Sequence, residues 1–341
     1  MKLTKALLVG ILAAALICLA VPALAGETLD AVKARGHLIA GANGGLFGFG
    51  MPDDKGEWKG LDVDTARAIA AAVFGDASKV KFVPLTAQQR FTALQSKEVD
   101  VLTRNCTQTL NRDTALGLDF APVNYYDGQG FMVPKKLGVK SAKELGGATV
   151  CTLPGTTTEM NAADYFRTHK MEWKPVVIEQ NAELNNAFFS GRCDCITSDR
   201  SQLAAIRAVA PNPDDYVILP EVISKEPLAP VVRHGDDQWK DIVAYVVYAL
   251  ITAEEMGITS QNVDEMLKSE DPAVKRFLGV EAGNGEALGL DEKWAYNVIK
   301  QVGNYAEIFE RNVGLGTPLA LDRGLNALWT QGGLMYSPPL K

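Results

Sequence analysis

The sequence predicts an α/β protein with two similar units followed by a helical segment. From residue 37 to residue 103, apolar strand candidates alternate with helical stretches in the order β-α-β-α-β, and the alternation recurs from residue 149 to residue 219. Such alternation predicts parallel sheets with helices on both faces. From residue 237 onward the pattern is helical and has no strands, so these helices must bury their apolar faces on an existing unit.

The first unit contains three strand candidates and three helix candidates. The strands are 37–42, 80–85 and 99–103, and the helices are 29–35, 61–74 and 88–95. Alanine and isoleucine recur at helical spacing in the second helix, and Gly75 provides its stop signal. Five glycines between residues 41 and 50 predict a turn-rich loop. We interpret it as a loop that faces a ligand; the alternative is a flexible loop without that role.

The same patterns predict the elements of the second unit and of the C-terminal segment. Its strand candidates are 149–153, 176–179, 193–197 and 216–219, and its helix candidates are 157–170, 182–189 and 200–210. Extended segments over 120–134 and 228–233 flank this unit. The later helix candidates are 239–250, 263–267, 273–278 and 292–309. The Gly- and Pro-rich segment after Asn312 is expected to form an extended tail on the surface.

Composition excludes several classes of function. The chain has 341 residues, a formal net charge of −7 at pH 7 and three histidines. An acidic chain without a dense Lys/Arg block is a poor candidate for binding nucleic acid. His37, His169 and His234 lie far apart in the sequence, which argues against a His-rich metal centre. We therefore expect no nucleic-acid partner, no metal and no cofactor.

The first 25 residues have the pattern of a secretory signal peptide. Two lysines precede an apolar run over residues 6–20, and Ala23-Leu24-Ala25 has the small-x-small pattern of a cleavage site. Cleavage is predicted after Ala25, which leaves an exported, soluble protein. A membrane anchor is a weaker alternative because the apolar run is short. A lipid anchor at Cys18 is weaker still, because the preceding residue is not small.

Six short phrases, in chain order, resemble those of one family. They are Gly60-Leu-Asp-Val-Asp-Thr-Ala, Arg90-Phe-Thr-Ala-Leu-Gln-Ser-Lys-Glu-Val-Asp, Thr107-Gln-Thr-Leu-Asn-Arg, Asp119-Phe-Ala-Pro, Gly155-Thr-Thr-Thr-Glu and Ser190-Gly-Arg-Cys-Asp. The chain resembles the periplasmic substrate-binding proteins of polar amino-acid ABC transporters, which form solute-binding protein family 3. Within that family it is most similar to the general L-amino-acid-binding branch, which shares Thr103-Arg-Asn and Asp322-Arg-Gly-Leu-Asn-Ala-Leu-Trp.

The resemblance implies a two-lobed periplasmic-binding-protein fold (Venus flytrap, type II) with the ligand in the cleft between the lobes. Two hinge crossings are expected near residues 126–131 and 225–231. Lobe 1 would begin with residues 26–128, and residues 129–228 would form an inserted lobe 2. Residues 229–341 would complete lobe 1 and add a helical C-terminal extension.

The resemblance also assigns residues to the two charged ends of an amino acid. For the carboxylate it implies Arg112, Thr107, Thr156 and Thr157, and for the ammonium Asp199, Asn105 and Thr107. The chemistry agrees, because the guanidinium fork suits a carboxylate and the first amides of a helix favour an anion. Each assignment has a plainer alternative. Arg112 could be a surface side chain, and the threonines and Asp199 could serve only as helix caps.

Contacts with the ligand side chain are implied for Asn43, Leu46, Phe47 and Arg104. Leu46 stands where the family commonly has an aromatic residue, so aromatic stacking on the ligand is not assured. A cation at Arg104 would favour Glu, Asp or Gln. If Arg104 instead points to solvent, the pocket would tolerate many side chains.

Four cysteines remain after the predicted cleavage, and they allow three full pairings. Export makes a disulfide possible. In the implied fold Cys151 and Cys193 lie at the starts of neighbouring strands of lobe 2, so a bridge between them is expected. Cys195 would share a strand face with Cys193 and is an alternative partner. A bridge from Cys106 would tie the lobes together and block opening.

The expected function is that of a periplasmic, monomeric binding protein. It would capture L-amino acids with broad specificity and deliver them to an inner-membrane ABC permease by hinge closure. Narrower binding of Glu, Asp and Gln is one alternative. A sensor module is another, and a dehydratase-type enzyme on the same fold is a third. The enzyme is disfavoured because an Asp paired with an ammonium stays ionised and is a poor acid.

Overall fold

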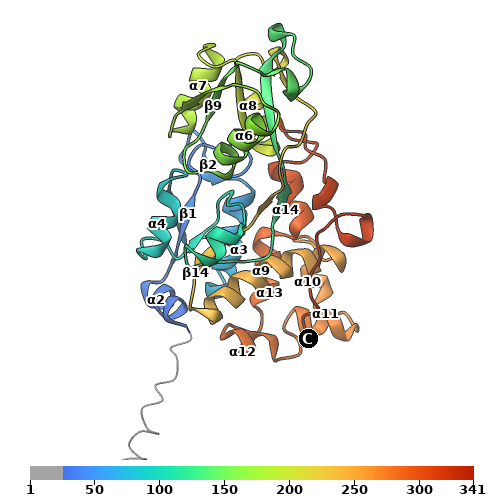
Figure 1. The fold of residues 1–341 in the computed structure, drawn as a ribbon. Helices are drawn as coiled ribbons and strands as arrows, with labels where there is room; N and C mark the ends of the chain where they lie inside the picture. The colour runs from blue at the N-terminus through green and yellow to red at the C-terminus, as the bar shows by residue number, and fades with distance from the viewer. Residues whose placement is uncertain (1–25) are drawn as a thin grey trace, which may run out of the picture.

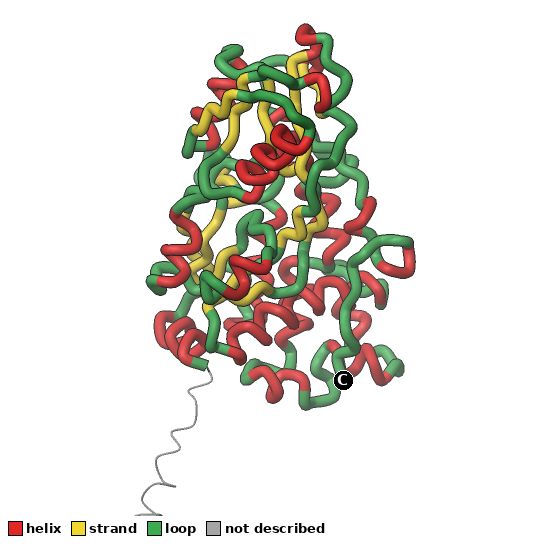
Figure 2. Tube along the Cα trace, viewed as in Figure 1, coloured by secondary structure: helices red, strands yellow, loops and turns green. Residues whose placement is uncertain are grey.

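The computed structural model describes residues 26–341 and consists of two lobes, one above the other in Figure 1. The signal peptide that the sequence predicts, with cleavage after Ala25, lies outside the described residues. Strands occupy the interior of each lobe and helices surround them (Figure 2). No helix within residues 26–341 is long and apolar enough to cross a membrane.

The first lobe is built on a five-stranded sheet with the strand order β4-β1-β5-β14-β6. Its strands are β1 (Leu38–Ala42), β4 (Val80–Pro84), β5 (Val101–Leu102), β6 (Leu118–Phe120) and β14 (Val231–Arg233). Its helices include α2 (Glu27–Arg35), α3 (Leu61–Phe74), α4 (Gln89–Gln95) and α5 (Leu110–Thr114). As predicted, β1 pairs with both β4 and β5 in parallel, and β14 adds an antiparallel strand. A small hairpin of β2 (Met51–Pro52) and β3 (Trp58–Lys59) was not predicted.

The second lobe repeats this plan with the strand order β10-β9-β11-β8-β12. Its strands are β8 (Gln129–Pro134), β9 (Thr149–Thr152), β10 (Lys174–Val177), β11 (Cys195–Asp199) and β12 (Tyr216–Ile218). Its helices are α6 (Thr157–Thr168), α7 (Asn181–Phe189) and α8 (Arg200–Ala208), with short 3-10 turns η1 (Lys135–Leu137), η2 (Ala142–Glu144) and η3 (Pro213–Asp215). Strands β9, β10 and β11 run parallel, whereas β8 and β12 run antiparallel to their neighbours.

Two strands connect the lobes. Strand β7 (Tyr125–Asp127) leads from the first lobe into β8, and β13 (Glu226–Leu228) leads back toward β14. They pair antiparallel, with Glu226 opposite Asp127 and Leu228 opposite Tyr125. The chain therefore crosses between the lobes at the two places that the sequence indicated.

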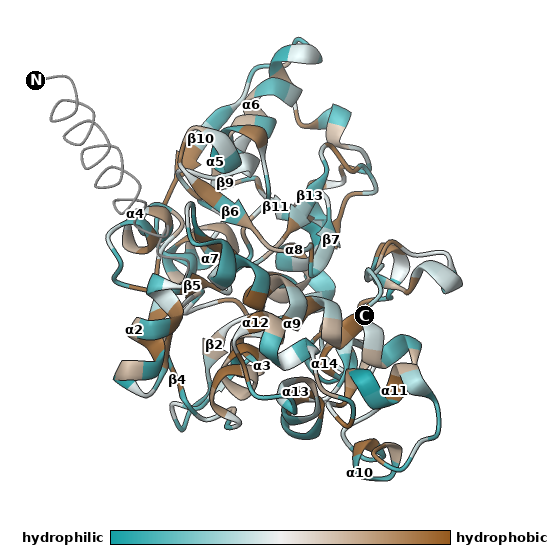
Figure 3. Cartoon of the chain, turned by 90° about the horizontal axis from the view of Figure 1, so that it is seen from below, coloured by the Kyte–Doolittle hydropathy of each residue, from teal (hydrophilic) through white to brown (hydrophobic). Residues whose placement is uncertain are grey.

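A group of helices forms one side of the first lobe (Figure 3). They are α9 (Asp237–Glu255), α10 (Val263–Met266), α11 (Pro272–Phe277), α12 (Asn284–Leu288), α13 (Trp294–Val302) and α14 (Tyr305–Asn312), followed by the turns η4 (Gly324–Asn326) and η5 (Trp329–Gln331). Helix α13 packs against α3 and α9, and α14 also packs against both. Their apolar residues belong to the same core cluster as those of β1 and α3, so these helices bury their faces on the first lobe as expected.

The single helix predicted over residues 292–309 is wrong, because the chain breaks between α13 and α14. Gly303 ends α13 with φ 89°, a backbone conformation that favours glycine. Asn304 then caps α14, and the side chain of Glu307 bonds back to the Asn304 N–H to complete a capping box. Apolar periodicity continues through the break, which explains why the pattern suggested one helix.

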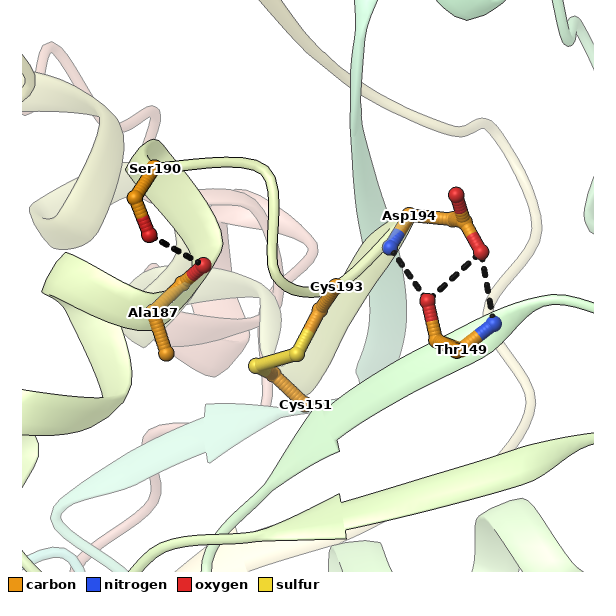
Figure 4. Close-up of a disulfide and its surroundings, with 6 residues drawn as sticks. All are labelled: Thr149, Cys151, Ala187, Ser190, Cys193 and Asp194. Atoms are coloured by element: carbon orange, nitrogen blue, oxygen red, sulfur yellow. Dashed lines mark hydrogen bonds between the residues drawn. A yellow bond between two sulfur atoms is a disulfide. The ribbon is translucent and has the colours of Figure 1, made fainter.

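The predicted disulfide between Cys151 and Cys193 is confirmed (Figure 4). The two Cα atoms lie 5.7 Å apart, with Cys151 on β9 and Cys193 just before the parallel neighbour β11. Cys195 is free and packs in a different core cluster from the bridged pair, beside Val150. The expectation that Cys193 and Cys195 share a strand face is therefore wrong, because β11 begins only at Cys195.

Replacing Gly303 by alanine should destabilise the protein. A Cβ at this position would approach Glu307 Oε2 to 2.8 Å and would hold a strained backbone conformation. We expect the free energy of unfolding to fall by about 1–3 kcal/mol. Chemical denaturation of Gly303→Ala, compared with Gly316→Ala, measures the effect. Gly316 lies outside the positive-φ glycines, and an added Cβ there would meet no atom within 4 Å, so its replacement should change stability little. Equal stability of the two variants would contradict the explanation.

Candidate ligand-binding site

An inner cavity lies in the cleft between the lobes and is lined by both. Its volume is about 20 Å³, which is room for about one water molecule. The lining residues are Asn43, Ala87, Arg90, Arg104, Asn105 and Thr107 from the first lobe, and Leu153, Thr156, Thr157, Thr158, Ser198, Asp199 and Gln202 from the second. The structure thus brings together seven of the residues that the sequence singled out: Asn43, Arg104, Asn105, Thr107, Thr156, Thr157 and Asp199.

A larger outer cavity of about 330 Å³ adjoins the inner one. The two share Asn43, Ala87, Arg104 and Leu153. The rest of the outer lining is mostly small or polar: Gly44, Gly45, Pro84, Leu85, Thr86, Gln89, Glu179, Gln180, Asn181 and Ala182. A group held in the inner cavity can therefore extend past Arg104 into this space.

Hydrogen bonds between side-chain amides join the two lobes across the cleft. Asn181 donates to Asn43 Oδ1 at 2.9 Å, and Asn105 donates to Gln202 Oε1 at 3.2 Å. Asn43 in turn donates to Asn105 Oδ1 at 3.0 Å. The lobes are thus in contact, and the structure represents a closed arrangement.

Asp199 supplies a buried carboxylate to the inner cavity. It is the last residue of β11 and directly precedes α8, and the residue is only 5% exposed. Burial raises its pKa well above the usual value, and the negative charges of Asp127 and Glu226 add to the shift. The side chain makes no capping bond to α8, so the alternative of a plain helix cap is not realised. A cation in the cavity would relieve the desolvation of this carboxylate.

The start of α6 supplies donors. Thr156 accepts from the Glu159 N–H at 3.1 Å and donates to the Leu153 carbonyl at 2.8 Å, so its hydroxyl serves as the helix cap. Thr157 and Thr158 follow as the first helical residues, and amides at these positions have no intrahelical acceptor. They face an anion favourably because of the helix dipole.

Three buried arginines lie on the first-lobe side of the cleft. Arg104 lines both cavities and donates through Nε to the Leu85 carbonyl at 3.2 Å. Burial lowers its pKa to about 9, and the charge of Arg90 contributes. Arg112 donates through Nη1 to the Thr107 carbonyl at 2.8 Å and lies over the Phe91 ring. Burial, and then the charge of Arg90, lowers the pKa of Arg112 to about 10.

Some expected contacts are not found at the inner cavity. Arg112 is buried nearby but does not line it. Leu46 and Phe47 instead line a further cavity of about 320 Å³, which shares Gly44, Gly45, Asn181 and Ala182 with the outer cavity. Leu46 is 2% exposed and belongs to the first-lobe core, because the glycine-rich loop folds it inward with Phe49.

Sequence reasoning missed two charged residues at the site. Arg90 lines the inner cavity, and its Nε atom is buried without a partner among the described residues. Its position at the head of the Arg90-Phe-Thr-Ala-Leu phrase was the available signal. Glu226, on β13, accepts hydrogen bonds from Thr107 and Thr157. No local motif marked it, because its contacts join three segments distant in the sequence.

The site places hydrogen-bond donors and hydrogen-bond acceptors together within a small group of residues. Guanidinium groups and free helix amides can bind an anion, while the Asp199 carboxylate can bind a cation. Buried charges are stable only when paired and hydrogen-bonded, so this set of groups is complementary in charge to a small molecule that carries both charges.

Comparison with known proteins agrees with this chemistry. The chain is 57% identical to the general L-amino-acid-binding periplasmic protein AapJ of Rhizobium johnstonii, covering 98% of this chain and 99% of that protein. It is also 57% identical to the glutamate/glutamine/aspartate/asparagine-binding protein BztA of Rhodobacter capsulatus, covering 96% and 97%. Both relatives are named as binding proteins.

A solved structure gives the same result for the fold. An ABC transporter periplasmic binding protein from Brucella ovis with glutathione bound superposes with a TM-score of 0.91 at 58% identity, covering 92% of this chain and 99% of that one. The family model for bacterial extracellular solute-binding proteins, family 3, matches residues 38–263. On the fold, the cleft and these matches together, the chain belongs to the bacterial extracellular solute-binding proteins of family 3.

Proposed function

We propose that this protein captures L-amino acids in the periplasm and delivers them to an inner-membrane ABC permease. The observation that carries the proposal is the inner cavity, where the buried Asp199 carboxylate faces buried guanidinium groups across a space enclosed by both lobes. An amino-acid zwitterion carries the two complementary charges. The names of its relatives from Rhizobium and Rhodobacter support the same ligand class.

The ligand carboxylate would bind Arg112 and the amides of Thr156 and Thr157. The ammonium would bind Asp199, Thr107 and the Asn105 carbonyl. Arg112 makes one bond to the Thr107 carbonyl, which leaves further donors of its guanidinium fork for a ligand. Because groups from both lobes hold one ligand, the closed state binds it more tightly, and this difference drives hinge closure.

The chain would act as an exported monomer. We assign residues 26–128 and 229–341 to lobe 1 and residues 129–228 to lobe 2, with cleavage of the signal peptide after Ala25. The membership of β8 and β12 in the second sheet, and of β14 in the first, supports these limits. We assign no catalytic role, since Asp199 paired with an ammonium would stay ionised and be a poor proton donor.

Broad specificity is favoured by the outer cavity. Its lining offers amide groups and small side chains around the guanidinium of Arg104 and the carboxylate of Glu179, so it imposes few shape requirements on a ligand side chain. Narrower binding of Glu, Asp and Gln is the alternative, in which Arg104 pairs with the side-chain oxygens.

The outer cavity also favours a second ligand class, the γ-glutamyl peptides. A γ-linked glutamyl residue keeps its α-ammonium and α-carboxylate free for the inner cavity, and the remainder would extend past Arg104. The space of about 330 Å³ is in the size range of small-molecule pockets. The glutathione in the Brucella ovis neighbour, a γ-glutamyl peptide, supports this class.

A thermal-shift screen of refolded, ligand-free protein tests the ligand class. Ligands that bind only the native state raise Tm by mass action. We expect shifts with many of the L-amino acids and with glutathione, but none with sugars or with a dipeptide in which glutamate is linked through its α-carboxyl group. A response confined to Glu, Asp and Gln would make Arg104 the selectivity residue. No response to any amino acid would overturn the proposal.

Replacing Arg112 by alanine should weaken amino-acid binding by at least about 2 kcal/mol, or roughly 30-fold in Kd, because a buried carboxylate loses its cation. Calorimetric titration measures the change. Arg167→Ala is the matched control, since Arg167 lies on the exposed side of α6 with its side chain 80% exposed. Near-wild-type affinity of Arg112→Ala would contradict the assignment of Arg112 to the ligand carboxylate.

Affinity should fall as the pH is lowered. Burial raises the pKa of Asp199 in the closed cleft without ligand, and a bound ammonium would lower it, so binding must displace the proton wherever Asp199 is protonated. Between about pH 5 and pH 8 the α-groups of the ligand do not titrate, and the loss should approach about tenfold per pH unit below the free-state pKa. Calorimetry in buffers of different ionisation enthalpy would detect the released proton. A constant Kd without proton release would contradict the role of Asp199.

A further inference from the structure

The Glu226 carboxylate is enclosed by hydrogen-bond donors from both lobes. Its side chain lies on the connecting strand β13, and the residue is 1% exposed. Oε2 accepts from the Thr107 hydroxyl at 2.6 Å and from the Thr157 hydroxyl at 2.8 Å. Oε1 accepts from Asn161 Nδ2 at 2.8 Å and from the Ser224 hydroxyl at 2.5 Å. An ionised carboxylate has about four lone-pair sites, so the four donors saturate it.

This saturation fixes the direction of two hydroxyl groups. A threonine hydroxyl has one proton to donate and two lone pairs that accept. Thr107 and Thr157 each donate that proton in a hydrogen bond to Glu226 Oε2, and the two hydroxyl oxygens lie 3.4 Å apart. Both residues also line the inner cavity. Toward a ligand, their hydroxyl oxygens can therefore only accept.

We infer that Glu226 is a positioning residue that sets the orientation of the bound amino acid, an inference that rests on the proposed function. With the hydroxyl protons of Thr107 and Thr157 turned away, the part of the cavity beside them accepts hydrogen bonds, as does Asp199. The α-ammonium must face this part. The α-carboxylate, which can only accept, is excluded from it and is left to the guanidinium groups and the amides at the start of α6.

The position of Glu226 couples this orientation to closure. Thr107 follows β5 in the first lobe, whereas Thr157 and Asn161 belong to α6 in the second. The carboxylate therefore holds both hydroxyl groups together only when the lobes are in contact. Discrimination between an ammonium and a group that cannot donate several hydrogen bonds is thus a property of the closed state.

The test compares L-glutamate with 2-hydroxyglutarate of the same chirality, in which a hydroxyl replaces the ammonium. For the wild-type protein we expect Kd to rise by at least about 100-fold for the hydroxy acid, because buried acceptors lose their donors. In Glu226→Leu the side chain offers no acceptor, so the hydroxyl protons of Thr107 and Thr157 lose their shared partner and are free to turn toward the cavity. We expect the ratio of the two Kd values to fall by about tenfold or more.

Ser224→Ala is the matched control. It removes a hydrogen bond to the same carboxylate, but on Oε1 and outside the residues that line the inner cavity, so the ratio should stay as in the wild type. An unchanged ratio in a folded Glu226→Leu variant would overturn the inference, whatever the change in affinity. A wild-type protein that binds neither glutamate nor any other amino acid would instead refute the proposed function.

Thr157→Val keeps the inference testable if Glu226→Leu does not fold. Valine matches threonine in shape and lacks the hydroxyl. If the hydroxyl accepts from the ammonium, its loss should weaken glutamate binding more than hydroxy-acid binding and so lower the ratio. Equal weakening of both ligands would mean that the hydroxyl donates to the carboxylate, and would overturn the inference.

Discussion

An ionised group that is taken out of water must be neutralised by a partner, and the cleft depends on this constraint. Glu226 is completed by four donors that the chain itself provides. Asp199 is equally buried but caps no helix, and burial raises its pKa. The fold thus supplies all the hydrogen-bond donors of Glu226, whereas the ammonium of the proposed ligand would neutralise Asp199. A ligand that supplies this cation also joins the two lobes, so binding and closure become one event.

The two sheets bring these groups together because their strands end at the cleft. Thr107 follows β5, Thr157 follows β9, and Asp199 is the last residue of β11. In an open parallel sheet the carboxyl ends of neighbouring strands meet at one edge, which is where such sheets bind ligands. Two such edges face each other here, and the paired strands β7 and β13 hold them at a common boundary. The crossing strands therefore form the hinge, and Glu226 on β13 holds the hydroxyl groups of Thr107 and Thr157 beside the inner cavity.

Sequence patterns predicted the features that local chemistry determines. Helix α3 has the predicted bounds because its periodicity ends at a glycine, and Cys151 could be paired because the implied sheet made β9 and β11 neighbours. The break at Gly303 was missed, since apolar spacing continues across it. Glu226 was missed for a different reason. Its role arises from donors more than 60 residues away in the sequence, which no local pattern can indicate.

The same distribution of chemistry accounts for the broad recognition that we propose. Charged groups of fixed polarity, namely Arg90, Arg104 and Asp199, line the inner cavity, where the α-groups that all L-amino acids share would bind. The outer cavity, where amino acids differ, offers amides, small residues and one guanidinium whose pKa burial has lowered. A protein that binds the α-ammonium and the α-carboxylate strongly does not need to select among ligand side chains, because these shared charges already supply the free energy of closure. Selectivity for α-amino acids and tolerance of their side chains then follow from the same distribution of charged groups.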